Sequence, residues 1–280
     1  MNDSFLTEVS QTVATALRED IGPGDVTAAL VDQSELAEAT IVTRETAVIA
    51  GRPWIDEVFH QVDPAVDLDW LVAEGEVAEP NQALIKLRGK AASILTGERT
   101  ALNFLQTLSG TATATHRFAS LLENYKTRLL DTRKTLPGLR LAQKYAVRLG
   151  GGQNHRIGLF DAYLIKENHI VAAGGIGPAI LKARTLNTDL RLEIEVESIA
   201  ELQEAIAAKP DWIMLDNFDD ESLKTAVSIT PDEIKLEVSG GIDAIEDILR
   251  IAALGVDYIS IGAITKHIRA TDLSLRLRIA

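Results

Sequence analysis

The residues best suited to chemistry lie between positions 131 and 169, in a glycine-rich stretch that gathers positive charge. Seven Arg or Lys residues against three Asp or Glu residues give this window a balance of +4, whereas the whole chain carries −13. An acidic protein that concentrates positive charge in one segment is expected to reserve it for an anionic ligand. The seven cations are Arg133, Lys134, Arg140, Lys144, Arg148, Arg156 and Lys166.

Only part of this window is expected to bind a ligand. Three of the cations follow one another at four-residue spacing and form one stripe of a predicted helix, which we interpret mainly as a solvated or partner-facing surface. Arg133 and Arg156 instead flank turn residues, which favours a role in binding, and His155 lies beside Arg156 in the glycine-rich loop. The helical stripe comprises Arg140, Lys144 and Arg148.

The elements that must position these residues follow a regular pattern from about residue 128 onwards. Short apolar runs typical of strands alternate with amphipathic stretches typical of helices, which predicts a parallel sheet with right-handed crossovers. Six such units are fewer than the eight of a closed barrel, so we predict an α/β fold with an open, incomplete barrel of about six or seven parallel strands. A doubly wound sheet is the alternative. The expected strands span residues 128–132, 162–166, 190–196, 211–216, 234–240 and 257–262.

The N-terminal part of the chain has a different pattern. Residues 4–19 are typical of an amphipathic helix, strands joined by turns are expected up to about residue 90, and two helices follow with a break at Ser109 and Gly110. The tail at 273–279 alternates apolar and polar residues, as a half-buried strand does, and we expect it to return to the N-terminal sheet. The predicted domains are an N-terminal domain at 1–110, a barrel domain at 111–270 and a C-terminal strand at 271–280.

The carboxyl ends of the predicted strands bring polar residues to one edge of the barrel, where the catalytic groups of parallel α/β barrels lie. Glu195 and Asp216 end neighbouring strands there. Buried carboxylates need partners, such as cations, a metal or substrate hydroxyls. A site with both signs of charge therefore indicates a highly anionic substrate together with a metal or a developing cation. The other polar residues at the strand ends are Asp131, Lys166, Glu237, Ser239 and Ser260.

Two glycine turns near the end of the chain fit a phosphate-binding role. The segments SGGI at 239–242 and IGAIT at 261–265 each follow a predicted strand and precede a predicted helix. Glycines let backbone N–H groups approach a phosphate, and a helix N-terminus adds partial positive charge. Barrel phosphate sites often follow the last two strands. The alternative is that both segments are ordinary tight turns.

Composition argues against several other classes of function. A pI near 4.9 argues against general nucleic-acid binding and against binding to anionic membranes. The chain contains no cysteine, which excludes disulfides, thiolate nucleophiles and cysteine-based metal sites. The first residues lack the basic and apolar regions of a signal peptide, and no apolar run approaches the roughly 18 residues of a membrane span. We expect a cytoplasmic protein.

These motifs together resemble the quinolinate phosphoribosyltransferase family, also called carboxylating nicotinate-nucleotide pyrophosphorylase. The resemblance covers nearly the whole chain in order, from EDIGPGDVT and GERTALNFLQTLSG through DTRKTLPGLR and GGGQNHRIGLFDAYLIKENHI to LEIEVE, IMLDNF, EVSGGI and ISIGAIT. It implies an N-terminal α/β sandwich domain in addition to the open barrel. It also implies transfer of phosphoribosyl from phosphoribosyl pyrophosphate to quinolinate with Mg²⁺. The products would be pyrophosphate, carbon dioxide and nicotinate mononucleotide for NAD synthesis.

The resemblance further implies roles for individual residues in substrate binding. The residues that would grip the two quinolinate carboxylates are Arg133, His155 and Arg156, helped by Lys134 and Lys166. Arg99 would reach the neighbouring subunit's site in a homodimer or hexamer. The residues that would hold the ribose phosphate are Ser239, Gly240, Gly241, Gly262 and Ala263.

Catalytic roles are implied in the same way. Glu195 and Asp216 would serve Mg²⁺, the ribose hydroxyls and the developing oxocarbenium charge, with Lys134 and Lys166 as further catalytic groups. One position departs from the family pattern, because Thr111 stands where an apolar residue is expected. This departure concerns the packing of a helix more than the site.

Three rival interpretations remain open on the sequence. A Schiff-base aldolase could use Lys166, which ends an apolar strand, although it would leave the surrounding arginines without a purpose. A same-fold relative of the pyrophosphorylases could act on a different substrate. A non-catalytic phosphosugar-binding protein would have no need of Glu195 and Asp216.

Overall fold

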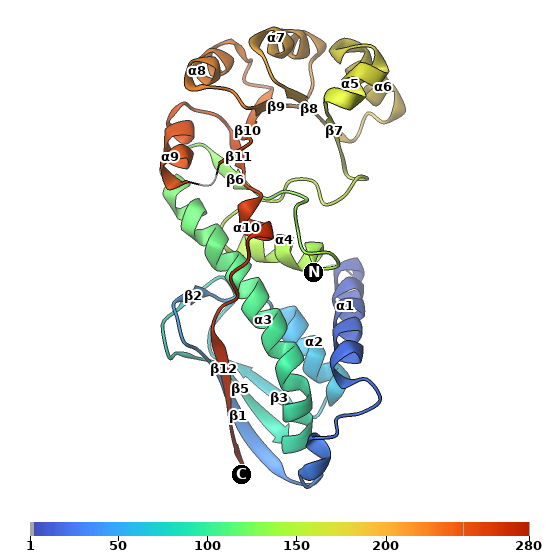
Figure 1. Cartoon of the computed structure of the whole chain (residues 1–280), viewed down its shortest axis with the longest axis vertical. Helices are drawn as coiled ribbons and strands as arrows, with labels where there is room; N and C mark the ends of the chain where they lie inside the picture. The colour runs from blue at the N-terminus through green and yellow to red at the C-terminus, as the bar shows by residue number, and fades with distance from the viewer. Residues whose placement is uncertain (1–2, 243, 280) are drawn as a thin grey trace. The chain divides into compact units, whose positions relative to one another are not determined.

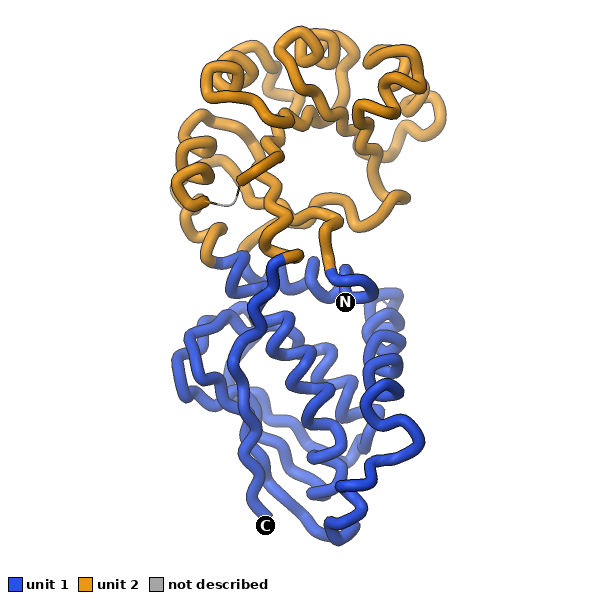
Figure 2. The backbone as a smooth tube through the Cα atoms, viewed as in Figure 1, with its two compact units in different colours: residues 1–116, 136–150, 267–280 blue, residues 117–135, 151–266 orange. Residues whose placement is uncertain are grey.

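The structure, a computed structural model, describes residues 3–242 and 244–279 and divides into two compact units (Figure 2). Unit 1 takes the chain up to His116, the segment Leu136–Gly150 and the segment from His267 onwards. Unit 2 takes Arg117–Thr135 and Gly151–Lys266. Each unit has its own principal sheet.

Unit 1 is built on a four-stranded antiparallel sheet in the order β12-β1-β5-β3. Strand β1 (Leu36–Thr43) lies between β12 (Leu273–Ile279) and β5 (Ala83–Lys90), and β3 (Asp67–Trp70) pairs with the other side of β5. The short strands β2 (Ala47–Val48) and β4 (Val77–Ala78) form a separate pair. The tail of the chain therefore lies in the same sheet as the first strand.

Helices of unit 1 contribute to its apolar core (Figure 1). Trp54 and Phe59 are fully buried there, and a Cβ on Gly97 would lie only 2.7 Å from the Phe59 ring. Glycine at this position therefore allows the close approach of two helices. The helical elements are α1 (Asp3–Ile21), η1 (Ala28–Leu30), α2 (Arg52–Val62), α3 (Ala91–Ala119), of which residues 117–119 belong to unit 2, and α4 (Arg140–Leu149).

The expected helix break at Ser109 and Gly110 is wrong, because α3 runs unbroken through both residues. The Ser109 hydroxyl is buried, donates to the Ala50 carbonyl at 3.3 Å and accepts from the Ala50 N–H at 3.1 Å. A Cβ on Gly110 would lie 2.3 Å from the carbonyl oxygen of Arg269. Both small residues therefore serve close packing against neighbouring segments, which outweighs the poor helix propensity of glycine.

The interpretation of the α4 stripe as a solvated face is wrong at Lys144, which is 1% exposed. Residues four apart on a helix are offset by about 40°, so the three cations share one side of α4, and only the middle one is enclosed. Arg148 is exposed and lies 5.8 Å from the Tyr145 ring. Buried Gln143 donates at 3.4 Å to the hydroxyl of Thr111, which accommodates the polar side chain at that position.

Unit 2 holds a six-stranded parallel sheet in the order β6-β11-β10-β9-β8-β7. Strands β7 to β11 follow one another in chain order, while β6 pairs with β11, so that β6 and β7 form the two edges. A doubly wound sheet would instead change direction at a switch point, so this order identifies the open barrel. The strands are β6 (Arg128–Leu130), β7 (Ala162–Ile165), β8 (Arg191–Val196), β9 (Trp212–Asp216), β10 (Lys235–Ser239) and β11 (Tyr258–Ser260).

Alternation along β8 sets the two faces of this sheet. Leu192, Ile194 and Val196 are fully buried on one face, and the two glutamates between them occupy the opposite face. Several helices lie along the outer side of the curved sheet (Figure 1). The helical elements of unit 2 are η2 (Ser120–Leu122), α5 (Glu167–Ala173), α6 (Ile176–Leu186), α7 (Ile199–Ala208), α8 (Asp220–Ile229), α9 (Ile245–Ala253) and α10 (Ala263–Lys266). Across the described residues, no helix combines the length and apolarity that a membrane span requires.

Aromatic packing occupies the amino ends of the central strands. The rings of Trp212 and Tyr258, which begin β9 and β11, stack at 4.2 Å, and the Arg191 guanidinium lies 4.0 Å from the Trp212 ring. Such stacking contributes to the packing at this end of the sheet.

The open side of the barrel is bordered by the segment that follows α4. Gln153 donates its N–H to Leu129 at 2.8 Å and accepts from the Asp131 N–H at 3.1 Å, which forms an isolated parallel bridge beside β6. The chain then continues through a loop at 154–161 to β7. The Asp161 carboxylate accepts two backbone N–H groups of this loop at 2.8 and 2.9 Å, which holds its turn closed.

Candidate active site

A cavity of about 180 Å³ lies at the carboxyl ends of the unit 2 strands. The loop after β6 and the loop before β7 supply most of its charged lining, whereas the strands supply Leu164, Met214 and Ser260. The predicted cationic residues therefore meet in one place. The full lining comprises Thr132, Arg133, Lys134, His155, Arg156, Leu164, Lys166, Met214, Glu237, Ser239 and Ser260.

Two guanidinium groups stand near each other in this cavity. Burial and the charge of Arg133 lower the pKa of Arg156, while the charge of Glu193 opposes that shift. The Arg133 Nε atom is buried, and it has no hydrogen-bond partner among the described residues. Neighbouring guanidinium groups with open donors are suited to an anion that they can bind through paired hydrogen bonds.

An ion pair occupies the rim of the site. Lys166 follows β7, and its ammonium group donates to Glu195 of β8 in a short contact. The side chains are 46% and 12% exposed, so the pair remains within reach of solvent and ligand. Nearby, a Cβ on Gly262 would lie 3.0 Å from Cδ of Lys134. Glycine at this position thus leaves room for the lysine side chain.

A second ionic cluster is enclosed within unit 2. Nε2 of His155 lies 2.8 Å from Oε2 of Glu193 on β8 and 3.3 Å from Oε2 of Glu237 on β10. Both glutamate side chains are fully buried, and His155 is 7% exposed. The Trp212 ring packs edge-on against the imidazole at 6.3 Å. Because little water reaches these groups, their protons must be shared within the cluster.

The pKa shifts and the hydrogen bonds disagree on where the shared proton lies. Burial opposes a charge on His155, but both carboxylates outweigh it and raise the pKa of His155 to about 9. Burial and the charge of Glu237 raise the pKa of Glu193 to about 7. Burial alone would raise the pKa of Glu237, but the contact with His155 and its charge, together with Ser260 and Glu193, lower that pKa overall.

Hydrogen-bond geometry decides the question. The Arg156 N–H donates to Nδ1 of His155 at 2.7 Å, and a ring nitrogen that accepts a hydrogen bond carries no proton of its own. We therefore assign the single ring proton to Nε2, facing the carboxylates, and the shared proton to Glu193. A neutral imidazole beside one protonated glutamate contains the same number of protons as an imidazolium between two ionised glutamates.

Asp131 fastens the loop that carries His155 and Arg156. Its buried carboxylate accepts from Asn154 Nδ2 at 2.6 Å and from the His155 N–H at 2.9 Å. Since Asp131 directly follows β6, it ties the loop to the edge strand of the sheet. The fixed positions of His155 and Arg156 thus depend on a carboxylate that does not line the cavity.

The turn after β10 brings glycine next to the predicted catalytic aspartate. Gly240 has a φ of +99°, and a Cβ there would lie 2.9 Å from Oδ1 of Asp216 and 3.0 Å from the Asn217 side chain. Gly241 also has a positive φ of +61°. The backbone therefore requires glycine on conformational grounds at both positions, and at Gly240 also to leave space for the carboxylate.

Most predicted site residues meet in this structure, and some do not. The cavity brings together Arg133, Lys134, His155, Arg156, Lys166 and Ser239, and Glu195 joins them through Lys166. Asp216, Gly240, Gly241, Gly262 and Ala263 do not line the cavity, and Arg99 lies on α3 in unit 1. The individual roles given to all these residues stay predictions.

Sequence reasoning missed the buried cluster. Glu237 was read only as a polar residue at a strand end and His155 only as a substrate contact, and Glu193 was given no role of its own. A usable signal was present, because a glutamate between apolar residues of a buried strand must have a partner inside the protein. The identity of that partner depends on which strands and loops meet in space.

Comparison with known proteins finds a family for both parts of the chain. Models described as the N-terminal and C-terminal domains of quinolinate phosphoribosyl transferase match residues 25–109 and 111–276. A protein of Bacillus subtilis (strain 168), named probable nicotinate-nucleotide pyrophosphorylase (carboxylating), is 41% identical over 258 residues, which cover 92% of this chain and 89% of that protein. A carboxylating nicotinate-nucleotide pyrophosphorylase of Mycobacterium leprae (strain TN) is 37% identical over 287 residues, covering 99% and 100%. The solved nicotinate-nucleotide pyrophosphorylase of Francisella tularensis has a TM-score of 0.94 at 52% identity, covering 98% of this chain and 97% of its own.

Proposed function

The chain belongs to the quinolinate phosphoribosyltransferase family, and on that premise we propose that it transfers phosphoribosyl from phosphoribosyl pyrophosphate to the ring nitrogen of quinolinate. The reaction releases pyrophosphate and carbon dioxide and forms nicotinate mononucleotide for NAD synthesis. The protein is thus a pentosyltransferase. One observation carries this proposal. Four cations that match the family motifs line one cavity, and the Nε atom of Arg133 there is buried without a hydrogen-bond partner among the described residues.

The cavity suits a rigid dianion. Arg133 and Arg156 offer planar donor groups to two carboxylates, and Lys134 and Lys166 add positive charge around them. A pyridine held in this way presents its ring nitrogen to the ribose carbon in a fixed direction, which is how orientation lowers a barrier. His155 lines the same cavity, but both of its ring nitrogens face protein groups. Its direct contact with quinolinate stays a prediction.

Carboxylates at the strand ends suit the other half of the reaction. Departure of pyrophosphate leaves positive charge on the ribose carbon, and Glu195 and Asp216 would stabilise that charge electrostatically. Decarboxylation follows glycosylation of the nitrogen, because the cationic pyridinium accepts the electrons left by carbon dioxide. No covalent enzyme nucleophile is needed.

Glu195 and Asp216 also fit Mg²⁺, which the family resemblance implies. Hard carboxylate oxygens are the ligands that Mg²⁺ prefers, and this ion is usually held by one or two carboxylates together with substrate phosphates and water. The two residues end neighbouring strands, and both offer such oxygens at the rim. The bound ion would neutralise charge on the leaving pyrophosphate.

The contacts of Lys166 count against the Schiff-base alternative. An aldolase lysine must lose its proton to attack a carbonyl, whereas Lys166 is paired with the Glu195 carboxylate. Borohydride trapping of substrate on Lys166 would be the observation in favour of that alternative.

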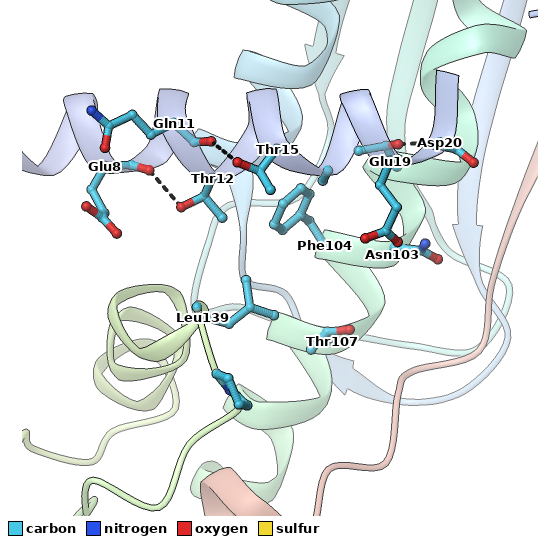
Figure 3. Close-up of a pocket in the computed structure, with 14 residues that line it drawn as sticks. Glu8, Gln11, Thr12, Thr15, Glu19, Asp20, Asn103, Phe104, Thr107 and Leu139 are labelled. Atoms are coloured by element: carbon cyan, nitrogen blue, oxygen red, sulfur yellow. Dashed lines mark hydrogen bonds between the residues drawn. The ribbon is translucent and has the colours of Figure 1, made fainter. Parts of the chain in front are cut away.

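We also propose that the protein acts as a homodimer or a larger assembly in which Arg99 reaches the neighbouring subunit's site, and that it is cytoplasmic. Arg99 is exposed on α3, and Asn103 and Thr107 follow it at four-residue spacing on the same helical face. Those two residues line a groove of about 500 Å³ in unit 1, with Phe104 and Leu139 (Figure 3). An exposed cation beside a groove of this size supports the approach of a second chain. Light scattering measures the size of the assembly. The Arg99→Ala variant should lose activity while its assembly keeps the same size.

One reaction mixture tests the proposed function. The protein is combined with phosphoribosyl pyrophosphate, Mg²⁺ and quinolinate, and carbon dioxide and nicotinate mononucleotide are followed together. We expect both products in equal amounts. Turnover of nicotinate in place of quinolinate would instead identify a same-fold enzyme with a different substrate, and binding without turnover would identify a phosphosugar-binding protein.

A further inference from the structure

The buried cluster of His155, Glu193 and Glu237 has no role in the reaction as proposed. Glu193 and Glu237 come from β8 and β10, the two strands that flank β9. In the described part of the chain, none of their four carboxylate oxygens makes a hydrogen bond of good geometry. Enclosing two such carboxylates costs free energy, so their presence at the border of a binding cavity calls for an explanation.

A metal ion is the first explanation to consider. One ligand atom from each of the three side chains lies within 4.8 Å of the others. A histidine that ligates a metal through Nε2 carries its proton on Nδ1 and normally donates it to a carbonyl or carboxylate. Nδ1 of His155 instead accepts the Arg156 N–H at 2.7 Å. The ring therefore presents a hydrogen to the two carboxylates, and no lone pair is left for a metal.

We propose that Glu193 and Glu237 are positioning residues that hold His155 and Arg156 in place for quinolinate, an inference that rests on the proposed function. Nε2 of His155 lies 2.8 and 3.3 Å from the two carboxylates. These close contacts from two strands limit how the imidazole ring can turn, although they are not hydrogen bonds of good geometry. The fixed ring then holds the Arg156 backbone through Nδ1. Arg156 touches neither glutamate by hydrogen bond, so the glutamates act on it through His155.

A third carboxylate completes the attachment from the other side. Asp131 accepts the His155 N–H at 2.9 Å, so that both the backbone and the ring of His155 are held. The three acids follow or belong to β6, β8 and β10. A segment of two residues is thus tied to three strands of one rigid sheet, which is the kind of support that precise positioning requires.

The consequence should be specific to one substrate. Arg156 is assigned to quinolinate, while phosphoribosyl pyrophosphate is assigned to the glycine turns and to the rim carboxylates Glu195 and Asp216. Loosening Arg156 should weaken the binding of quinolinate and leave the binding of phosphoribosyl pyrophosphate unchanged. A cluster with a purely structural role would lower the stability of the protein and leave the ratio of the two KM values unchanged.

Steady-state kinetics on the full-length protein test this inference. The variants are Glu193→Leu and Glu237→Leu, which remove the polar group, with Glu233→Leu as the matched control, because Glu233 is an exposed glutamate just before β10. We expect the KM for quinolinate to rise by about tenfold or more in both cluster variants, since small misplacements in a site have large effects. The KM for phosphoribosyl pyrophosphate should stay within about twofold, and the control should match the wild type.

An unchanged KM for quinolinate in folded cluster variants would overturn the inference. Inactive wild-type protein would contradict the proposed function instead, so the two failures are distinguishable. A measurement on the wild type covers the case in which the variants do not fold. The ¹⁵N shifts of histidine-labelled protein, with His155 assigned through His155→Asn, should show the Nε2–H tautomer. A proton on Nδ1, or one equivalent of metal bound to the purified protein, would also overturn the inference.

Discussion

Glu193 and Glu195 stand two residues apart on β8, and their side chains point to the same face of the sheet. Glu193 is fully buried against His155, whereas Glu195 is 12% exposed and pairs with Lys166. The residue nearer the carboxyl end reaches the rim, and the other remains inside the barrel. Depth along one strand therefore separates a carboxylate that holds the site together from one that can meet substrate.

The largest expected effect is the loss of stability in Glu193→Ala. Removing one partner of a buried ionic cluster costs about 3–5 kcal/mol, because the remaining charges stay buried without compensation. Urea denaturation measures the free energy of unfolding. Glu195→Ala is the comparison, and it should cost less than about 1 kcal/mol, as partly exposed pairs do. Equal losses of stability in the two variants would show that the depth of a glutamate along β8 does not determine its contribution to stability.

Arg133→Ala should show the opposite profile from Glu193→Ala. Its guanidinium is reserved for ligand, so truncation should weaken quinolinate binding by about 2–5 kcal/mol, the scale for removing one partner of a buried charge pair. The free energy of unfolding should change by less than about 0.5 kcal/mol. Calorimetric titration with quinolinate and urea denaturation measure the two quantities. A normal affinity would show that Arg133 does not contact this substrate.

The pH dependence of stability should come from the deep glutamate. Burial and Glu237 raise the pKa of Glu193 from 4.5 to about 7, so the folded protein keeps a proton that the unfolded chain releases. This contribution to stability is complete below pH 4.5 and is lost as the pH rises through about 7. Glu193→Gln should flatten this part of the stability profile, and Glu195→Gln should leave it in place. An unchanged slope in Glu193→Gln would contradict the assignment of the shared proton.

Lys166→Met should have only a small effect on stability. The Lys166 and Glu195 side chains are accessible enough for water to replace the ion pair, so its loss should cost about 0.2–1 kcal/mol. Activity should nevertheless fall strongly, because the variant removes a cation from the cavity. Thermal unfolding and turnover measured on the same preparation check both statements. A large loss of stability would mean that the rim pair also supports the barrel.

Sequence patterns were sufficient for most of the barrel. Each predicted strand from 128–132 to 257–262 contains an observed one, because apolar runs between turn residues have few other ways to fold. The same reasoning failed at Ser109 and Gly110, where it took small residues for a helix break. Their function depends on Ala50 and Arg269, which lie far away in sequence, so no local pattern could reveal it.

The site shows the same limit. Arg133, Arg156 and Lys166 were predicted to converge, since groups at the carboxyl ends of parallel strands share one edge. Lys144 carries the same charge as these residues and was expected to be solvated, yet it is buried in unit 1. Spacing along a helix states which residues share a face, but the neighbouring elements determine whether that face meets water.

Local patterns are enough for the fold class and for the chemical types present in the site, because hydrophobic periodicity and charge are properties of short segments. The family follows from motifs that keep their order along the chain. The pairing of His155 with Glu193 and Glu237 instead joins a loop to two separate strands, and no local pattern contains it. Strand alternation makes the two glutamates of β8 alike, and only their depth in the folded barrel encloses one beside His155 and leaves the other partly exposed beside Lys166.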